Sequence, residues 1–137
     1  MTTLPAITPV AQATYALLQA IPDLNTFDTE LPTDPPRDSD GRVHPYAVFF
    51  PGGGRAFGDR LNQDTATDLA WDFRVLFVGG DMTRALWALD KIRAALTGAR
   101  PSGGARLKEV LDDVTIRTET NVVPSRTSGA ILYRLHI

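Results

Sequence analysis

Apolar and polar residues alternate over ten positions in the middle of the chain, which predicts a β-strand over residues 69–78. Successive strand side chains point to opposite sides, so one face gathers the large apolar residues and should be buried. This predicted core face carries Leu69, Trp71, Phe73, Val75 and Phe77. The other face (Ala70, Asp72, Arg74, Leu76 and Val78) starts polar and becomes apolar near Gly79. We expect another element or a neighbouring subunit to cover its apolar end.

The pattern changes to a helical period directly after Gly79-Gly80. Asp81 is the expected N-cap, since its carboxylate accepts a bond from an early helical N–H, and Gly98 is the expected C′ residue. Trp87 lies outside the apolar stripe and belongs either to the core or to a contact surface. The stripe itself consists of Ala85, Leu86, Ala88, Leu89, Ile92 and Leu96.

A second helix is expected near the N-terminus, with Thr8 as N-cap, Pro9 in the first helical position and Pro22 after its end. Steps of three and four residues place its apolar side chains on one face. These are Val10, Ala13, Leu17, Leu18 and Ile21.

Three further strands complete the expected sheet. Residues 45–50 are apolar on both faces, which indicates a central strand. Residues 114–123 and 130–137 alternate around a short loop and predict an antiparallel hairpin, while Leu107, Val110 and Leu111 fit a short helical turn or a strand. We therefore expect one α+β domain over 1–137, in the order α-β-β-α-β-β. Its mainly antiparallel sheet of four strands, or slightly more, has two helices packed on one face.

Two long polar segments separate these elements. Residues 23–44 contain several prolines and aspartates and read as irregular, with a short strand or turn around 25–31. Residues 52–68 open with three glycines and join two strong strands, so we expect a protruding hairpin loop. Ordering such a loop costs backbone entropy, which makes it a candidate for becoming ordered on contact with a partner.

Composition narrows the classes of function. The 137 residues carry a net charge of −2, which argues against a dedicated nucleic-acid binder. Cysteine is absent, so disulfides and thiolate metal sites are excluded. We expect neither a signal peptide nor a membrane span. The aromatic residues of the predicted core face have only apolar neighbours there, which favours core packing over base stacking.

Candidate chemistry is sparse. The glycines at 52–54 lack the lysine and the spacing of phosphate-binding loops, and residues 38–41 match a calcium loop less well than an aspartate-rich turn. His44 and His136 form no helical pair for zinc, and no Gly-x-Ser-x-Gly nucleophile elbow occurs. We therefore expect no catalytic residues, no metal and no cofactor.

The layout resembles the tail-terminator, or tail-completion, proteins of long-tailed bacteriophages. The resemblance spans nearly the whole chain: a leading helix, a strand ending Tyr46-Ala-Val-Phe-Phe-Pro51, a polar loop, the strand Asp72-Phe-Arg-Val-Leu-Phe-Val78, the helix Thr83–Leu96 and two C-terminal strands. The resemblance rests on the order of the elements and on the general character of their sequences, because the family has few invariant motifs. The segments 23–44 and 52–68 have no motif that aligns.

The resemblance implies a structural protein of the virion, assembled in the host cytoplasm and located in the tail or neck. Family members form a hexameric ring on the last ring of tail-tube subunits, stop tube growth and present a surface to the head connector. Genomic DNA passes through the centre without specific binding. We expect the subunit or partner contacts on the loop 52–68 or on the polar sheet face: Arg55, Phe57, Arg60, Asp72, Arg74, Arg117, Glu119 and Arg134.

Three other interpretations stay open. A head-completion or connector protein of the same neck would have a similar sequence pattern but would form a ring of different symmetry. A small enzyme or ligand-binding α+β domain would need a concave site with convergent polar groups. A nucleic-acid-binding module would show salt-dependent affinity.

Overall fold

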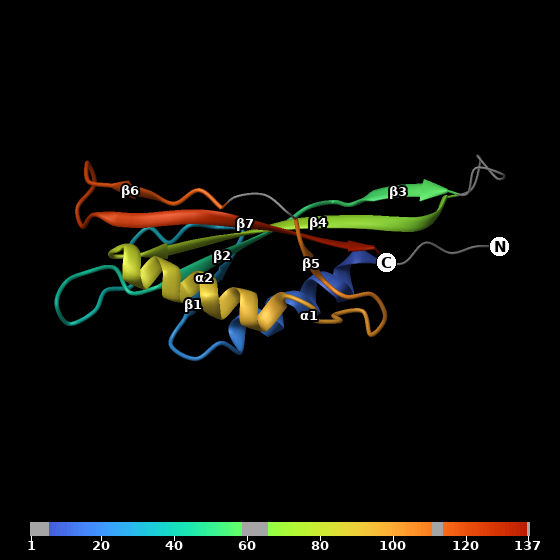
Figure 1. The fold of residues 1–137 in the computed structure, drawn as a ribbon, viewed down its shortest axis with the longest axis horizontal. Helices are drawn as coiled ribbons and strands as arrows, with labels where there is room; N and C mark the ends of the chain where they lie inside the picture. The colour runs from blue at the N-terminus through green and yellow to red at the C-terminus, as the bar shows by residue number, and fades with distance from the viewer. Residues whose placement is uncertain (1–5, 59–65, 111–113, 137) are drawn as a thin grey trace.

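The chain folds into an α+β structure in which two helices lie under one mixed sheet (Figure 1). The computed structural model describes residues 6–58, 66–110 and 114–136. No helix in these ranges is both long enough and apolar enough to span a bilayer. The elements are α1 (Ile7–Gln19), β1 (Asn25–Asp28), β2 (Tyr46–Pro51), β3 (Arg55–Gly58), β4 (Ala66–Gly79), α2 (Met82–Leu96), β5 (Lys108–Glu109), β6 (Arg117–Glu119) and β7 (Arg126–His136).

The sheet is built around the long antiparallel pair β4–β7. Its strand order is β1-β2-β4-β7-β5, with β3 also paired to β4 and β6 also paired to β7. Only the β1–β2 pair is parallel among these pairings. The expected α+β class with a mainly antiparallel sheet is confirmed, but β1, β3 and β5 add strands to the expected order.

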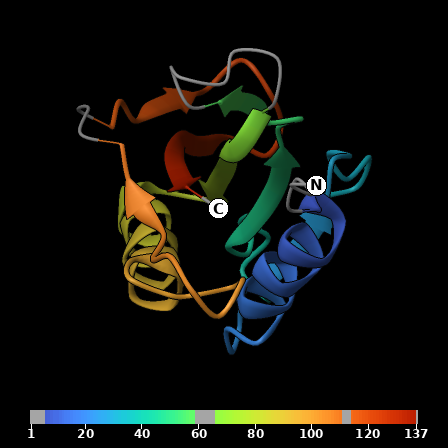
Figure 2. The same ribbon diagram turned by 90° about the vertical axis from the view of Figure 1, so that its right-hand side faces the viewer.

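Both helices cover the same face of the sheet, as predicted (Figure 2). Trp71 and Phe73 on β4 lie beneath them, and Tyr15 of α1 stacks on Phe49 of β2 with ring centroids 5.8 Å apart. Burying each large apolar side chain contributes roughly 1.5–3 kcal/mol. The core face observed in the structure consists of Ala47, Phe49, Leu69, Trp71, Phe73, Val75, Phe77, Ile131, Tyr133 and Leu135.

Helix α1 starts earlier than expected. Ala6 is its N-cap and makes no side-chain capping bond, so the assignment of Thr8 as N-cap was wrong. A proline is tolerated in the first turn because those N–H groups have no intrahelical partner, and Pro9 therefore fits inside the helix. The helix buries Thr14 on its inner face, where the Thr14 hydroxyl donates to the Val10 carbonyl at 2.8 Å.

Helix α2 follows the sequence prediction at both ends. The Asp81 carboxylate accepts a bond from the Arg84 backbone N–H at 2.8 Å, and Gly98 follows the C-cap with φ of +80°. The expected stripe is buried except for Leu86, which is 43% exposed. Trp87 is half-buried against the core, with the Lys91 ammonium 5.8 Å from its ring centroid.

The expected protruding loop after β2 is in part a strand, which corrects the prediction. Strands β2 and β3 pair with successive halves of β4, and the glycines at 52–54 link them. The Gly52 N–H donates to the Asp72 carbonyl at 3.0 Å, and Gly54 has φ of +78°, which favours glycine. This link therefore acts as a bulge in the stretch of chain that pairs with one edge of β4.

The C-terminal hairpin forms with different bounds. Strand β7 begins at Arg126 rather than at residue 130, and of the expected strand 114–123 only Arg117–Glu119 pairs with it. The Thr118 and Thr127 hydroxyls lie 3.0 Å apart across this pair. Strand β5 settles the alternative left open for Leu107 and Val110, since Lys108–Glu109 pairs with β7, while Leu111 lies outside the described residues.

The segment 23–44 contains the short strand expected near its start, β1. Its other end covers the apolar end of the second sheet face, because Val43 packs with Tyr46, Val48 and Val78. The apolar end of this face, which we expected another element or a neighbouring subunit to cover, is thus covered by a segment of the same chain.

Candidate partner-binding surface

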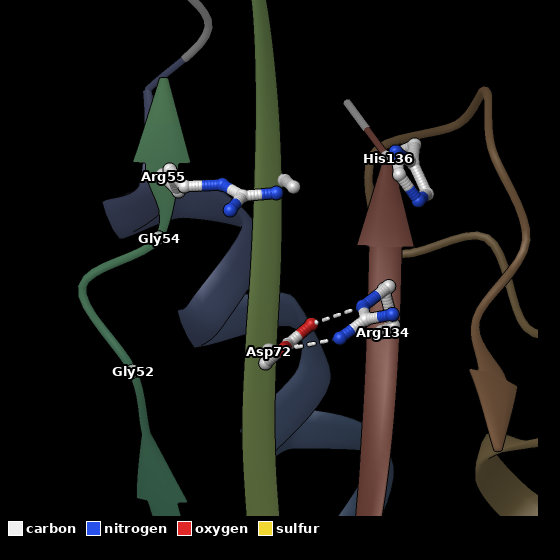
Figure 3. A pocket seen from close by; sticks show the side chains of 7 residues that line it. Gly52, Gly54, Arg55, Asp72, Arg134 and His136 are labelled. Atoms are coloured by element: carbon white, nitrogen blue, oxygen red, sulfur yellow. Dashed lines mark hydrogen bonds and ion pairs between the residues drawn. The ribbon is translucent and has the colours of Figure 1, made fainter. Parts of the chain in front are cut away.

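The second face of the sheet remains open where β3, β4 and β7 meet. Neither helix of the described residues covers the sheet here, and the side chains of three neighbouring strands share one surface (Figure 3). The cross-strand register places Ala70 opposite Arg55 and His136, and Arg74 opposite Leu132. We call this surface the open sheet face: Arg55, Ala70, Asp72, Arg74, Leu132, Arg134 and His136.

A bidentate ion pair lies at the centre of the open sheet face. Arg134 Nε donates to Asp72 Oδ1 at 2.8 Å, and Arg134 Nη2 donates to Asp72 Oδ2 at 3.0 Å. These residues are direct neighbours across β4 and β7. The hydrogen bonds from Arg134 hold the pKa of Asp72 below its ordinary value of 3.8, and the charges of His136 and Arg55 act in the same direction. The carboxylate therefore stays charged at neutral pH.

A hollow of about 380 Å³ opens beside this pair, bordered by Gly52, Gly54, Arg55 and His136. The Arg55 side chain extends from β3 toward β4 (Figure 3). Among the described residues, no ion pair or hydrogen bond of the Arg55 guanidinium offsets its charge. The open sheet face is consequently basic, since Arg55 and Arg74 add to an Asp72–Arg134 pair that is itself neutral.

The other end of the open sheet face is partly apolar. A smaller hollow of about 210 Å³ lies between Phe50, Pro51, Arg74 and Leu132. Leu132 is 36% exposed, and Arg74 is also exposed. Exposed arginine beside apolar side chains is typical of protein–protein contact surfaces.

The sequence-predicted set of contact residues divides into two groups. Asp72, Arg74 and Arg134 share one face, as expected, and Arg55, which was expected on a separate loop, lies beside them on β3. Arg117 and Glu119 lie on β6 at the far end of β7, where Glu119 pairs with Arg126 at 3.0 Å. Ser128, the residue opposite Arg117, lies six positions before Arg134, which corresponds to roughly 20 Å of strand. Arg60 and the side chain of Phe57 lie outside the described residues.

A cluster of charged side chains that the sequence analysis did not identify ties the segment 23–44 to α2. Arg84 donates to Asp38 at 2.9 Å, to Asp40 at 3.2 Å and to Asp81 at 2.7 Å. Arg42 reaches Asp81 at 2.8 Å. We call these residues, with His44, the arginine–carboxylate clip. The only sequence signal for the clip was its run of aspartates, which was correctly interpreted as a turn: the Gly41 N–H donates to the Asp38 carbonyl at 2.9 Å.

His44 is held between two oxygen acceptors in this clip. Its Nδ1 lies 2.6 Å from an Asp38 carboxylate oxygen and its Nε2 lies 2.7 Å from the Asp23 carbonyl. Both nitrogens donate only when both carry a proton, so the geometry favours the imidazolium. Partial burial opposes this charge, but the bonds to Asp38 and Asp23 outweigh it and raise the pKa of His44 above 6.5.

We expect the clip to weaken as pH rises through the folded-state pKa of His44. The stabilisation is fully present below about pH 6.5, the value for an unperturbed histidine, and is lost above the raised pKa. The contribution of the Asp38 carboxylate to the stability of the clip is lost only at acid pH, since the hydrogen bond from His44 lowers the pKa of Asp38 below 3.8. NMR titration of the imidazole protons tests this, with His44→Gln identifying the signal and removing this part of the pH dependence. A titration midpoint at or below 6.5 would contradict the expectation.

Outside this clip the described residues offer little further chemistry. No group of three or more His, Asp or Glu side chains in residues 6–58, 66–110 and 114–136 is arranged to hold a metal ion. The glycines at 52–54 serve the bulge described above. Comparison with known proteins adds no assignment, because no family model and no curated protein matches the sequence significantly.

Proposed function

We propose that this chain is a tail-terminator protein of a long-tailed bacteriophage, a structural subunit rather than an enzyme. The observation that carries the proposal is the open sheet face, where exposed Arg74 and Leu132 lie on the two longest strands of the fold. A basic and partly apolar surface of this kind suits recognition of another protein. The order of elements, which resembles that family, supports the same role.

The mechanism of such a protein is geometric. A ring closes when one heterologous contact is repeated around an axis, and the two ends of that ring then differ. One end binds the last ring of tail-tube subunits and ends polymerisation. The other end presents a surface to the head-completion protein, and DNA passes through the lumen. In the virion, therefore, the chain's partners are its own copies, the tube protein and the connector.

Adding the purified chain to polymerising tail-tube protein of the same virus is expected to yield tubes of limited length, each with a ring at one end. Electron microscopy gives the tube lengths, and averaged end views give the ring symmetry, for which we expect six. Tube protein alone is the control. Tubes of unlimited length without a bound ring would contradict the proposal, and a twelvefold ring bound to the portal would instead indicate a head-completion protein.

A further inference from the structure

A second exposed surface on α2 complements the open sheet face. Met82 and Leu86 are 45% and 43% exposed, and Asp90 follows one turn later, also exposed. Residues four apart lie on the same side of a helix, so the three form one stripe. We call it the α2 stripe: Met82, Leu86 and Asp90. It is apolar at its N-terminal end and acidic at its C-terminal end.

The two surfaces lie on different sides of the molecule. Helix α2 packs on the core face through Ala85, Leu89 and Ile92, whereas the open sheet face is on the opposite side of the same sheet. They share no residue, so one copy has both surfaces available at once. A contact between unlike surfaces of identical chains is heterologous, the kind that closes into rings.

Spacing and charge match between them. Arg74 and Leu132 are opposite each other on β4 and β7, about 5 Å apart. Leu86 and Asp90 are separated by about 6 Å along the helix. A helix lying across the strands therefore places Leu86 on Leu132 and Asp90 beside Arg74. Among the described residues, neither Arg74 nor Asp90 forms a salt bridge, and the charge of Asp90 contributes to the raised pKa of Arg93 on the same helix. Both side chains can therefore pair with a partner.

We propose that the α2 stripe of one copy docks on the Leu132–Arg74 part of the open sheet face of the next copy, with Asp90 pairing with Arg74. This inference rests on the proposed ring and names the two surfaces of its subunit contact. Both surfaces contribute exposed apolar side chains, whose removal from water favours association. The charge pair fixes which copy presents which surface.

Charge reversal tests the contact. Arg74→Glu places like charges opposite Asp90, and Asp90→Arg places like charges opposite Arg74. Each single variant is expected to self-associate at least about tenfold more weakly than the wild type, since juxtaposed like charges disfavour association. Arg106→Glu reverses an exposed arginine that belongs to neither surface and is expected to leave assembly unchanged. Sedimentation velocity measures ring assembly, both for the chain alone in solution and for the chain bound to tube ends.

Restoring opposite charges at positions 74 and 90 distinguishes the proposed contact from other subunit contacts. The double variant R74E/D90R regains opposite charges at every contact and is expected to assemble. An equal mixture of the two single variants also assembles, because alternating copies pair opposite charges throughout an even-numbered ring. That recovery also shows that both variants are folded.

Two outcomes would overturn the inference, and they differ in what else they overturn. If the single variants form rings as well as the wild type does, the subunit contact lies elsewhere and the proposed function stands. If the wild type stays monomeric both in solution and with tail tubes, the contact and the proposed function fail together.

Discussion

Replacing Trp71 with alanine is expected to lower the free energy of unfolding by about 3–5 kcal/mol, the range for removing a large aromatic side chain from a core. Trp71 is fully buried, and its ring centroid lies 4.8 Å from that of Phe73 and 6.4 Å from that of Phe49. Its indole N–H also donates to the Gly52 carbonyl at 2.9 Å. The substitution therefore opens a cavity and removes a tie to the β2–β3 link. Urea unfolding followed by circular dichroism gives the change.

The second tryptophan provides a matched control. Trp87 is only half-buried on α2, so Trp87→Ala removes the same atoms with less cavity formation and a smaller loss of stability. An effect of Trp71→Ala no larger than that of Trp87→Ala would mean that the central aromatic cluster is not the main source of core stability.

Replacing Gly79 with alanine is expected to destabilise the fold by about 1–3 kcal/mol or more, the cost typical of overpacking. A Cβ at this position would lie 2.5 Å from the Ala85 backbone nitrogen and 2.7 Å from the Arg84 carbonyl carbon. These are backbone atoms of the first turns of α2, so relief requires the helix to move away from β4. Thermal unfolding by calorimetry measures the loss.

Gly53→Ala is the control for Gly79→Ala, because a Cβ on Gly53 meets nothing within 4 Å. Its expected effect on the melting temperature is small. Equal destabilisation by the two substitutions would show that chain entropy at glycine, rather than close approach of α2, determines the outcome.

The elements predicted well are those with their own periodicity. Strand β4 and helix α2 were identified because alternation and a three-to-four-residue stripe are encoded locally, as are the Asp81 cap and Gly98. Strands β3 and β5 depend instead on pairing with β4 and β7, and such register is set by the three-dimensional fold. Leu86 fitted the apolar stripe in the sequence, but it lies at the margin of the buried face of the helix.

The candidate surface was predictable in composition but not in arrangement. Alternation placed Asp72 and Arg74 on one face, yet only the β4–β7 register reveals that Arg134 pairs with Asp72. The same reasoning grouped Arg117 with them, although β6 lies at the other end of β7. The arginine–carboxylate clip joins residues more than forty positions apart, such as Asp38 and Arg84, which no local pattern relates.

The bulged glycine link has a consequence for recognition. Strands β2 and β3 together occupy one edge of β4 through most of its length, and β7 occupies the other. Neither edge of this central strand is therefore available for strand addition, in which backbone bonds supply the affinity whatever the side chains are. A binding partner at this part of the molecule must therefore be recognised through its side chains. When two proteins recognise each other through side chains, a substitution on one can be matched by a substitution on the other. The contact is then preserved while both sequences diverge from their ancestors.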